Sequence, residues 1–297
     1  MEEQNKPRPI AKVSVPLTFI KVLLSPFLRT TGLRCIASIF KNFFFSQYRA
    51  AFLPGLVPVS PVDHPLDKKI PFLPGKVNTY LDFTAFWIRT IGFLLGNCGR
   101  TALEPVRNFM ETMGSLYAFA AEVYRKNLST TERPFYISHP KFLLIHTVDP
   151  HLMCIPSLHV MIVICTYTLF ADIILKLGAA KKFAFQAEEL RRGAMAITEA
   201  VLYIKQHSVN CISAAMYAMT CFEPRLFPVN EAGRFADKIF RDSKIPGEKD
   251  SLLIREHILS LYRSFLAQGE EAGYIPGGNN TGADWKKPLL DFLKNQQ

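Results

Sequence analysis

The sequence lacks closely spaced cysteines. Its six cysteines form no Cys-x-x-Cys pair, which is the spacing typical of zinc fingers and of thioredoxin-like redox sites. It also lacks internal repeats and any segment that combines basic and aromatic residues in the manner of a nucleic-acid-binding motif. We therefore expect reduced thiols buried among apolar residues, no metal site, no cofactor, and no nucleic acid as a partner.

Charged residues are few and unbalanced in sign. They make up 20% of the chain against 49% hydrophobic residues, and the mean hydropathy is +0.12. This composition is too polar for a fully membrane-embedded bundle and too apolar in patches for an ordinary soluble domain. The net charge of +10 favours an anionic partner, such as an acidic lipid head group or a phosphorylated substrate. We expect a membrane protein with an additional soluble part.

The first 53 residues contain no uninterrupted apolar run of the ~20 residues that cross a bilayer. Two runs, 13–30 and 32–53, are broken by Lys, Arg and Pro, and no small-residue cleavage site of a signal peptide is present. The runs predict amphipathic helices at a membrane interface or, equally, helices packed on a soluble core. Six prolines in 54–76 predict an extended connector, which completes an N-terminal segment over 1–77.

The rest of the chain predicts an all-α fold. Residues 157–177 are the best candidate for a membrane-spanning helix, because this run is apolar and long enough to cross a bilayer. Residues 128–156 contain four prolines and predict a loop. The composition becomes more polar after Glu223, so we divide the chain into a helical core over 78–222 and a soluble helical tail over 223–297. Further helices or apolar stretches are expected over 78–97, 103–127, 194–204, 208–222 and 249–268.

A first motif combines two cations. Lys126 is followed, after six residues, by Arg133-Pro134. Lysine binds a phosphate as a point charge and arginine binds it through a planar fork of donors. Without further context the same cations would be interpreted as partners of the C-terminus of the 103–127 helix.

A second motif places a hydroxyl and an imidazole at a helix start. Pro156-Ser157-Leu158-His159 ends the proline-rich loop and opens the most apolar run of the chain. Proline ends the loop and serine is a good N-cap, so Ser157 and His159 are expected where backbone donors and the helix dipole favour an anion. The plainer interpretation is a capped helix with an incidental interfacial histidine.

A third motif, Lys205-Gln206-His207, supplies another histidine and another cation. Two histidines, basic residues and a hydroxyl on apolar helices are the groups that phosphoryl transfer through a phosphohistidine requires. His159 and His207 are separated by 48 positions, which is enough for one helix, a turn and a returning helix. We expect both histidines at the same end of that helix pair.

In order and spacing these motifs resemble those of the type 2 phosphatidic acid phosphatase superfamily, over roughly residues 100–222. The resemblance implies a partly membrane-embedded helical bundle that cleaves a lipid phosphate or related phosphate ester without a metal. It implies that His207 attacks phosphorus and that His159 protonates the leaving oxygen. The residues implied to bind the phosphate are Lys126, Arg133, Ser157 and Lys205.

The third motif departs from the family pattern, which is Ser-Arg, five residues, His, three residues, Asp. With His207 as the nucleophile, Ala200 and Val201 stand at the Ser-Arg positions and Cys211 stands at the Asp position. The carboxylate normally orients the imidazole and supports its positive charge, which a neutral thiol does poorly. Two alternatives therefore stay open: a lipid head-group phosphotransferase, and a catalytically impaired homologue that binds lipid phosphates.

Two further observations complete the sequence hypothesis. The segment that joins the two histidine-bearing helices is rich in Lys and Arg, which predicts a cytoplasmic location for it and an outward location for His159 and His207. His146, Asp149 and His151 lie within six positions of one another. Flanking prolines and the absence of a helical i, i+4 arrangement argue against a metal site there.

Overall fold

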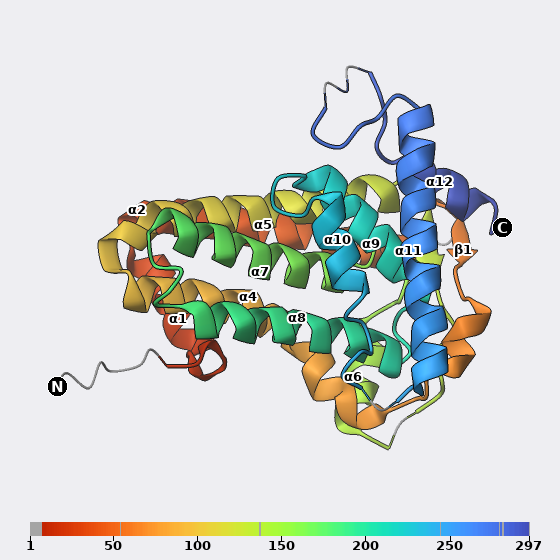
Figure 1. Ribbon diagram of the computed structural model, residues 1–297, viewed down its shortest axis with the longest axis horizontal. Coiled ribbons are helices and arrows are strands. Elements are labelled where there is room, and N and C mark those ends of the chain that lie inside the picture. The colour runs from red at the N-terminus through yellow and green to blue at the C-terminus, as the bar shows by residue number, and fades with distance from the viewer. Residues whose placement is uncertain are drawn as a thin grey trace.

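Helices make up most of the chain, and the all-α prediction is confirmed. The only strands within the described ranges are β1 (Val59–Pro61) and β2 (Leu128–Thr130), which pair in parallel with Ser60 opposite Ser129. Residues 1–7 and Pro54, which belong to the expected N-terminal segment, lie outside the described residues. The computed structural model (Figure 1) describes residues 8–53, 55–136, 138–243, 245–278, 280 and 282–296.

The central helix of the fold is α7 (Leu158–Lys176). It packs against α4 (Val77–Asn97), α5 (Leu103–Tyr124), α8 (Ala184–Tyr203) and α9 (Val209–Phe222), and Figure 1 shows it side by side with α8. A helix that is apolar on all sides is stable only where all sides are covered by apolar material. Among the described residues α7 alone is long and apolar enough to cross a membrane, and 78% of its most apolar window is buried inside the protein.

The N-terminal apolar runs form several short helices instead of two long ones. Ser14 and Ser25 each accept a hydrogen bond from a backbone N–H of the helix that follows, so α1 (Val15–Leu24) ends where α2 (Pro26–Ile39) begins. α1 packs on α4 and α2 packs on α5. The chain then continues through a π-helical turn, η2 (Phe40–Phe45), into α3 (Ser46–Phe52).

The proline-rich segments hold more structure than the sequence predicted. The expected connector contains β1 and two 3₁₀ helices, η3 (Pro65–Lys69) and η4 (Pro74–Lys76). The prediction of a loop throughout 128–156 is wrong, because α6 (Pro140–Val148) forms inside it. The His139 side chain accepts a hydrogen bond from the Lys141 N–H, and proline is favoured at the first position of a helix, where its missing N–H has no partner to lose.

The apolar stretch 194–204 is not a separate element. It is the second half of α8, whose first half carries charged residues and an ion pair between Arg191 and Glu188. Ion pairs of this spacing stabilise an exposed helical turn, so the helix extends beyond the apolar run that the sequence pattern marks.

The C-terminal residues pack on the core. α11 (Glu248–Glu271) lies along α9, and α12 (Lys287–Lys294) packs on α11. The Ser213 hydroxyl donates to the Ile258 carbonyl at 3.0 Å, and the Tyr217 hydroxyl donates to the Trp285 carbonyl at 2.9 Å. The shorter α10 (Val229–Ala236) connects the two parts. α9 is therefore covered by protein on the side that α7 leaves free.

Candidate functional site

Two histidines from the ends of neighbouring helices meet in the protein interior. His159 lies in the first turn of α7, and His207 lies in the short connection between α8 and α9. His207 Nε2 and His159 Nδ1 are 3.3 Å apart, which is hydrogen-bond distance. The ring centroids are 5.3 Å apart and the rings meet edge to face. The expected return of the chain along α8 thus brings both imidazoles to one end of the helix pair.

Aromatic rings from α4 hold the His159 imidazole. The Tyr80 ring stacks on it with 4.6 Å between centroids, and the Phe83 ring lies at 4.2 Å on a tilted plane. Such contacts restrict the orientation of a ring without using its nitrogens. The polar edge of His159 is consequently available to His207 and to a ligand.

Ser157 occupies the N-cap position of α7 but does not cap it through its side chain. The expectation of a side-chain cap is therefore wrong. The residue is fully buried, and its hydroxyl finds no hydrogen-bond partner within the part of the chain that the structure describes. A buried hydroxyl without a partner is costly, which makes it a group that a bound water or ligand would satisfy.

Arg133 reaches the same region from the loop after β2. Its guanidinium donates to the Gln206 side-chain oxygen and to the Asp149 carbonyl, both at 3.4 Å. The positive charge of Arg133 also affects the pKa of His151. Burial is the main cause that lowers the pKa of His151 to about 2, and the positive charge of Arg133 adds to it. Arg133 therefore contacts two residues of the histidine cavity wall, Gln206 and Asp149, but does not line the cavity itself.

Lys205 is next to the histidine pair in sequence but faces another pocket. Its ammonium donates to the carbonyls of Asp67 and Ile70 at the end of η3. Burial lowers the pKa of this lysine, and the Asp67 charge opposes the shift. It lines an open pocket of about 520 Å³ that it shares with Arg133. The structure places the Lys205 ammonium away from the cavity that the two imidazoles line.

Lys126 is not brought to the histidines. It is exposed, beyond the C-terminus of α5. Burial would raise the pKa of Asp284, but hydrogen bonds from Lys286 and the nearby charges of Lys286 and Lys126 lower it. The electrostatic influence of Lys126 is thus on the C-terminal segment. The neighbouring Arg125 instead points its guanidinium to Asn42, at 2.6 Å.

The cavity at the two histidines is small. Its volume is about 20 Å³, which is enough for one water molecule. A phosphate group does not fit in this conformation. The residues that line it come from η2, α3, α4, α7 and the loops at their ends: Phe43, Gln47, Tyr80, Asp149, His151, Met153, Cys154, Leu158, His159, Gln206 and His207.

Several of these residues were not assigned to this site from the sequence. His151 and Asp149 were considered only as metal ligands, yet they line the cavity with the histidine pair. His151 is buried and its Nε2 lies 2.8 Å from the Thr131 hydroxyl. Their closeness to the Pro-Ser-Leu-His motif in sequence was the available signal. Tyr80 gave no signal, because it is one aromatic residue among many on the apolar helix α4.

The environment of His207 keeps its imidazole neutral. Burial lowers the pKa of His207 to about 3, against a smaller opposing effect of the Cys154 main chain. Its Nδ1 is buried and forms no hydrogen bond with a described residue. Cys211, at the position where the family pattern has a carboxylate, is fully buried, and burial raises the pKa of its thiol well above the usual range. The thiol is therefore protonated at neutral pH.

One carboxylate does line the cavity. Asp149 accepts hydrogen bonds from the His151 N–H, at 2.9 Å, and from the Gln47 side-chain amide. Both bonds hold the carboxylate within the cavity wall, apart from the two catalytic candidates. Within the described ranges, no group of three or more His, Cys, Asp or Glu side chains has the arrangement that would hold a metal ion.

No protein-family model, no curated protein and no solved structure matches the chain.

Proposed function

We propose that the chain is a metal-independent phosphatase that acts on a lipid phosphate or a related phosphate ester through a phosphohistidine. The observation that supports the proposal most is the 3.3 Å contact between His159 and His207 at the start of α7. Arg133 contacts Gln206, the residue before His207, and Ser157 supplies a buried hydroxyl two positions before His159. These four residues correspond to the arginine of the first motif, the serine and histidine of the second, and the histidine of the third in the type 2 phosphatidic acid phosphatase superfamily, whereas Lys126 of the first motif is exposed elsewhere.

The proposed chemistry divides the two imidazoles into a nucleophile and an acid. A neutral His207 has a free lone pair on Nε2, and this nitrogen bonds to phosphorus while the ester P–O bond breaks. The departing oxygen takes a proton from His159, and the negative charge of the bound phosphate must first raise the pKa of this imidazole, which burial and the neighbouring His207 hold well below its usual range. A water molecule then attacks phosphorus and gives a proton back to His159, and the P–N bond breaks to release inorganic phosphate.

The phosphate oxygens need donors while the charge is redistributed. The Arg133 guanidinium offers a planar set of N–H groups, and the start of α7 offers backbone N–H groups with the positive end of the helix dipole. The Ser157 hydroxyl, which has no hydrogen-bond partner among the described residues, would gain one. We assign Lys205 to holding the loop that carries His207, because its ammonium is already bonded to two carbonyls.

Substrate entry requires the site to open. The cavity of about 20 Å³ admits no phosphate, so the hydrogen bond between His159 and His207 must break and the rings must separate. Met153 lines this cavity and also a larger surface pocket next to it.

We also propose that the protein is partly embedded in a membrane, as in the bundle of that superfamily. The support comes from α1, α2, η2 and α3, whose outer surfaces combine basic residues with many exposed apolar ones. A helix with this combination lies in the interface plane of a bilayer. The most exposed of these apolar residues are Leu17, Ile20, Leu24, Leu33, Phe40, Phe45 and Phe52.

A second candidate function is phosphate binding without turnover. It is favoured by His207 Nδ1, which has no carboxylate to orient it, and by the protonated thiol at Cys211. A head-group phosphotransferase would use the same phosphohistidine, with an alcohol in place of water in the second step. These alternatives differ in what leaves the site and not in how the phosphate is held.

The test is phosphate release from a short-chain phosphatidic acid by the purified full chain in the presence of EDTA. We expect activity that EDTA does not remove and that His207→Ala abolishes. The matched control is His139→Asn, because asparagine keeps the N-cap of α6. Activity that depends on an added metal, or that survives His207→Ala, would refute the proposal. Binding of inorganic phosphate without turnover would favour the second candidate, and transfer to an added alcohol would identify the transferase.

A further inference from the structure

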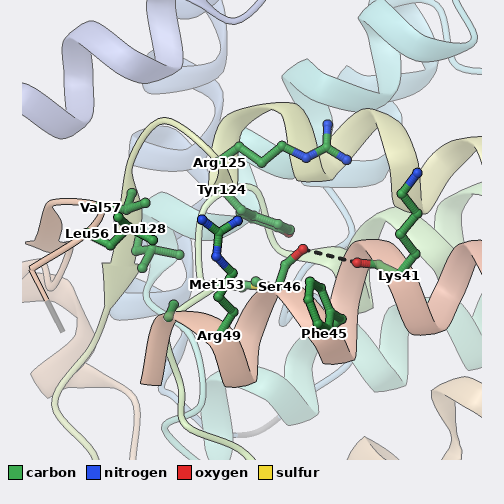
Figure 2. A pocket seen from close by; sticks show the side chains of 11 residues that line it. Lys41, Phe45, Ser46, Arg49, Leu56, Val57, Tyr124, Arg125, Leu128 and Met153 are labelled. Atoms are coloured by element: carbon green, nitrogen blue, oxygen red, sulfur yellow. Dashed lines mark hydrogen bonds between the residues drawn. The ribbon is translucent and has the colours of Figure 1, made fainter. Parts of the chain in front are cut away.

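A surface pocket separate from the histidine cavity lies between η2–α3 and the C-terminal end of α5. Its volume is about 470 Å³, which is more than twenty times that of the histidine cavity. Figure 2 shows Lys41 and Arg49 on one helical segment and Arg125 on the segment above it, with the Tyr124 ring between them. All three cationic side chains are exposed.

The charge of this pocket is unbalanced. Three of its lining residues are cationic and none is acidic. Among the ion pairs of the described residues, none involves Lys41, Arg49 or Arg125. Three uncompensated positive charges around one concave surface attract an anion.

A second pocket of the same protein also contains several cations, but its positive charge is compensated by carboxylates. The pocket of about 420 Å³ between α8 and the residues after α10 is lined by four cations, but three carboxylates line it as well. Arg191 and Arg192 both pair with Glu188 there. Its charges are therefore largely compensated, whereas those of the pocket beside α3 are not.

Arg125 is held in place by buried polar groups. Its Nη2 donates to the Asn42 side-chain oxygen at 2.6 Å, and Asn42 is only 6% exposed. The Asn42 amide nitrogen donates in turn to the Ser38 carbonyl at 3.0 Å. A guanidinium has five N–H donors, so one bond fixes the group and leaves the others for a ligand.

Apart from Ser46, the rest of the pocket lining is largely apolar. Phe45 is 66% exposed and Leu56 is 53% exposed at its rim. The exposed apolar side chains of α1 and α2 precede these lining residues along the chain. Cationic side chains beside exposed apolar ones match the boundary of a bilayer, where lipid phosphates lie above acyl chains.

We propose that Lys41, Arg49 and Arg125 form a head-group site for an acidic phospholipid of the bilayer on which the α1–α3 surface rests. The lipid phosphate lies among the three cations, and its acyl chains lie against Phe45 and Leu56. The bound lipid docks the protein and is not the molecule that reacts, because Met153 separates this pocket from the histidines. The inference rests on the proposed membrane contact of α1–α3 and does not depend on catalysis by His207.

The test is co-sedimentation of the full chain with vesicles of phosphatidylcholine alone and of phosphatidylcholine mixed with phosphatidylglycerol. We expect tighter binding to the anionic vesicles. The variant Lys41→Gln/Arg49→Gln/Arg125→Gln should lower that binding about 100-fold, since each basic residue near an anionic surface contributes about a factor of five. The matched control, Arg192→Gln/Lys238→Gln/Arg241→Gln, removes the same charge from the compensated pocket and should bind like the wild type.

Three outcomes would overturn the inference. The first is equal binding of the triple variant and the wild type to anionic vesicles. The second is an equal loss in the control variant, which would indicate net charge alone. The third is binding of inorganic phosphate at these residues without binding to vesicles, which would indicate a free anion. His207→Ala should bind vesicles like the wild type, so failure of the proposed catalysis and failure of this site are distinguishable. Circular dichroism and thermal unfolding verify that each variant is folded.

Discussion

His207 Nε2 lies 3.3 Å from His159 Nδ1, although 48 positions separate the two residues along the chain. The contact depends on α7 and α8 packing side by side, with one histidine at the start of the first helix and the other just after the end of the second. A hydrogen bond between two imidazoles, of which His207 is buried, gives a helical core a simple acid–base unit.

The first prediction separates the two cations of the first motif. Arg133→Gln should lower kcat/KM for a phosphate ester by 10-fold to 100-fold, as expected for a lost hydrogen bond to a charged group of about 1.5–3 kcal/mol. Lys126→Gln should leave kcat/KM unchanged, because Lys126 is exposed and influences Asp284 instead. Steady-state kinetics of both variants check this. A larger loss in Lys126→Gln than in Arg133→Gln would contradict the geometry.

The second prediction concerns the residue four positions after His207. Cys211→Asp should raise turnover tenfold or more, because an ionised carboxylate fixes the imidazole tautomer and stabilises its positive charge. The same change should lower Tm, because position 211 is fully buried and a buried carboxylate is costly. Cys211→Ser is the control of similar size without the charge, and we expect no gain in its turnover. If Cys211→Asp folds and its rate does not rise, Cys211 does not occupy the orienting position.

The third prediction is a loss of stability in mild acid. The pKa values of His207 and His151 are lowered to about 3 and about 2, mainly by burial, from an ordinary value of 6.5. Between pH 6.5 and these values the unfolded chain binds protons that the folded chain does not. The free energy of unfolding therefore falls with falling pH, by up to about 1.4 kcal/mol per pH unit for each histidine.

Urea unfolding at pH 7 and pH 5 measures this effect. His207→Gln should remove its share of the pH dependence, whereas His139→Asn should retain the wild-type slope. Equal stability of the wild type at the two pH values would show that the two imidazoles are not buried in the neutral form.

The fourth prediction concerns the close approach of α1 to α4. A Cβ at Gly92 would lie 2.0 Å from the Thr18 hydroxyl and 2.8 Å from a Val13 methyl group. Gly92→Ala should therefore lower the free energy of unfolding by about 1–3 kcal/mol through overpacking. Gly96→Ala, one turn further along the same helix, meets no atom within 4 Å and should raise it by about 0.5–1 kcal/mol through helix propensity. Chemical denaturation of both variants measures the difference, and a stable Gly92→Ala protein would show that α1 does not pack there.

The local patterns in the sequence predicted several elements closely. The run 157–177 corresponds to α7 at Leu158–Lys176, and the stretch 208–222 corresponds to α9 at Val209–Phe222. Both are marked by apolar composition and by residues that begin or end helices, and these signals act over a few positions. α6 was missed because the prolines of its segment were interpreted as breakers, although proline at a first helical position favours a helix.

The sequence by itself determined that the chain is helical, basic and supplied with two histidines at helix ends, because composition, periodicity and caps depend on neighbouring residues only. The tertiary structure decided which side chains meet. Consecutive residues at the end of α5 point in different directions, so Arg125 faces the pocket beside α3 whereas Lys126 faces the C-terminal segment. It also decided that the buried Ser157 hydroxyl has no hydrogen-bond partner among the described residues and that α11 covers α9. These are contacts between residues far apart in the chain, and they depend on how whole helices pack and not on the order of residues within one helix.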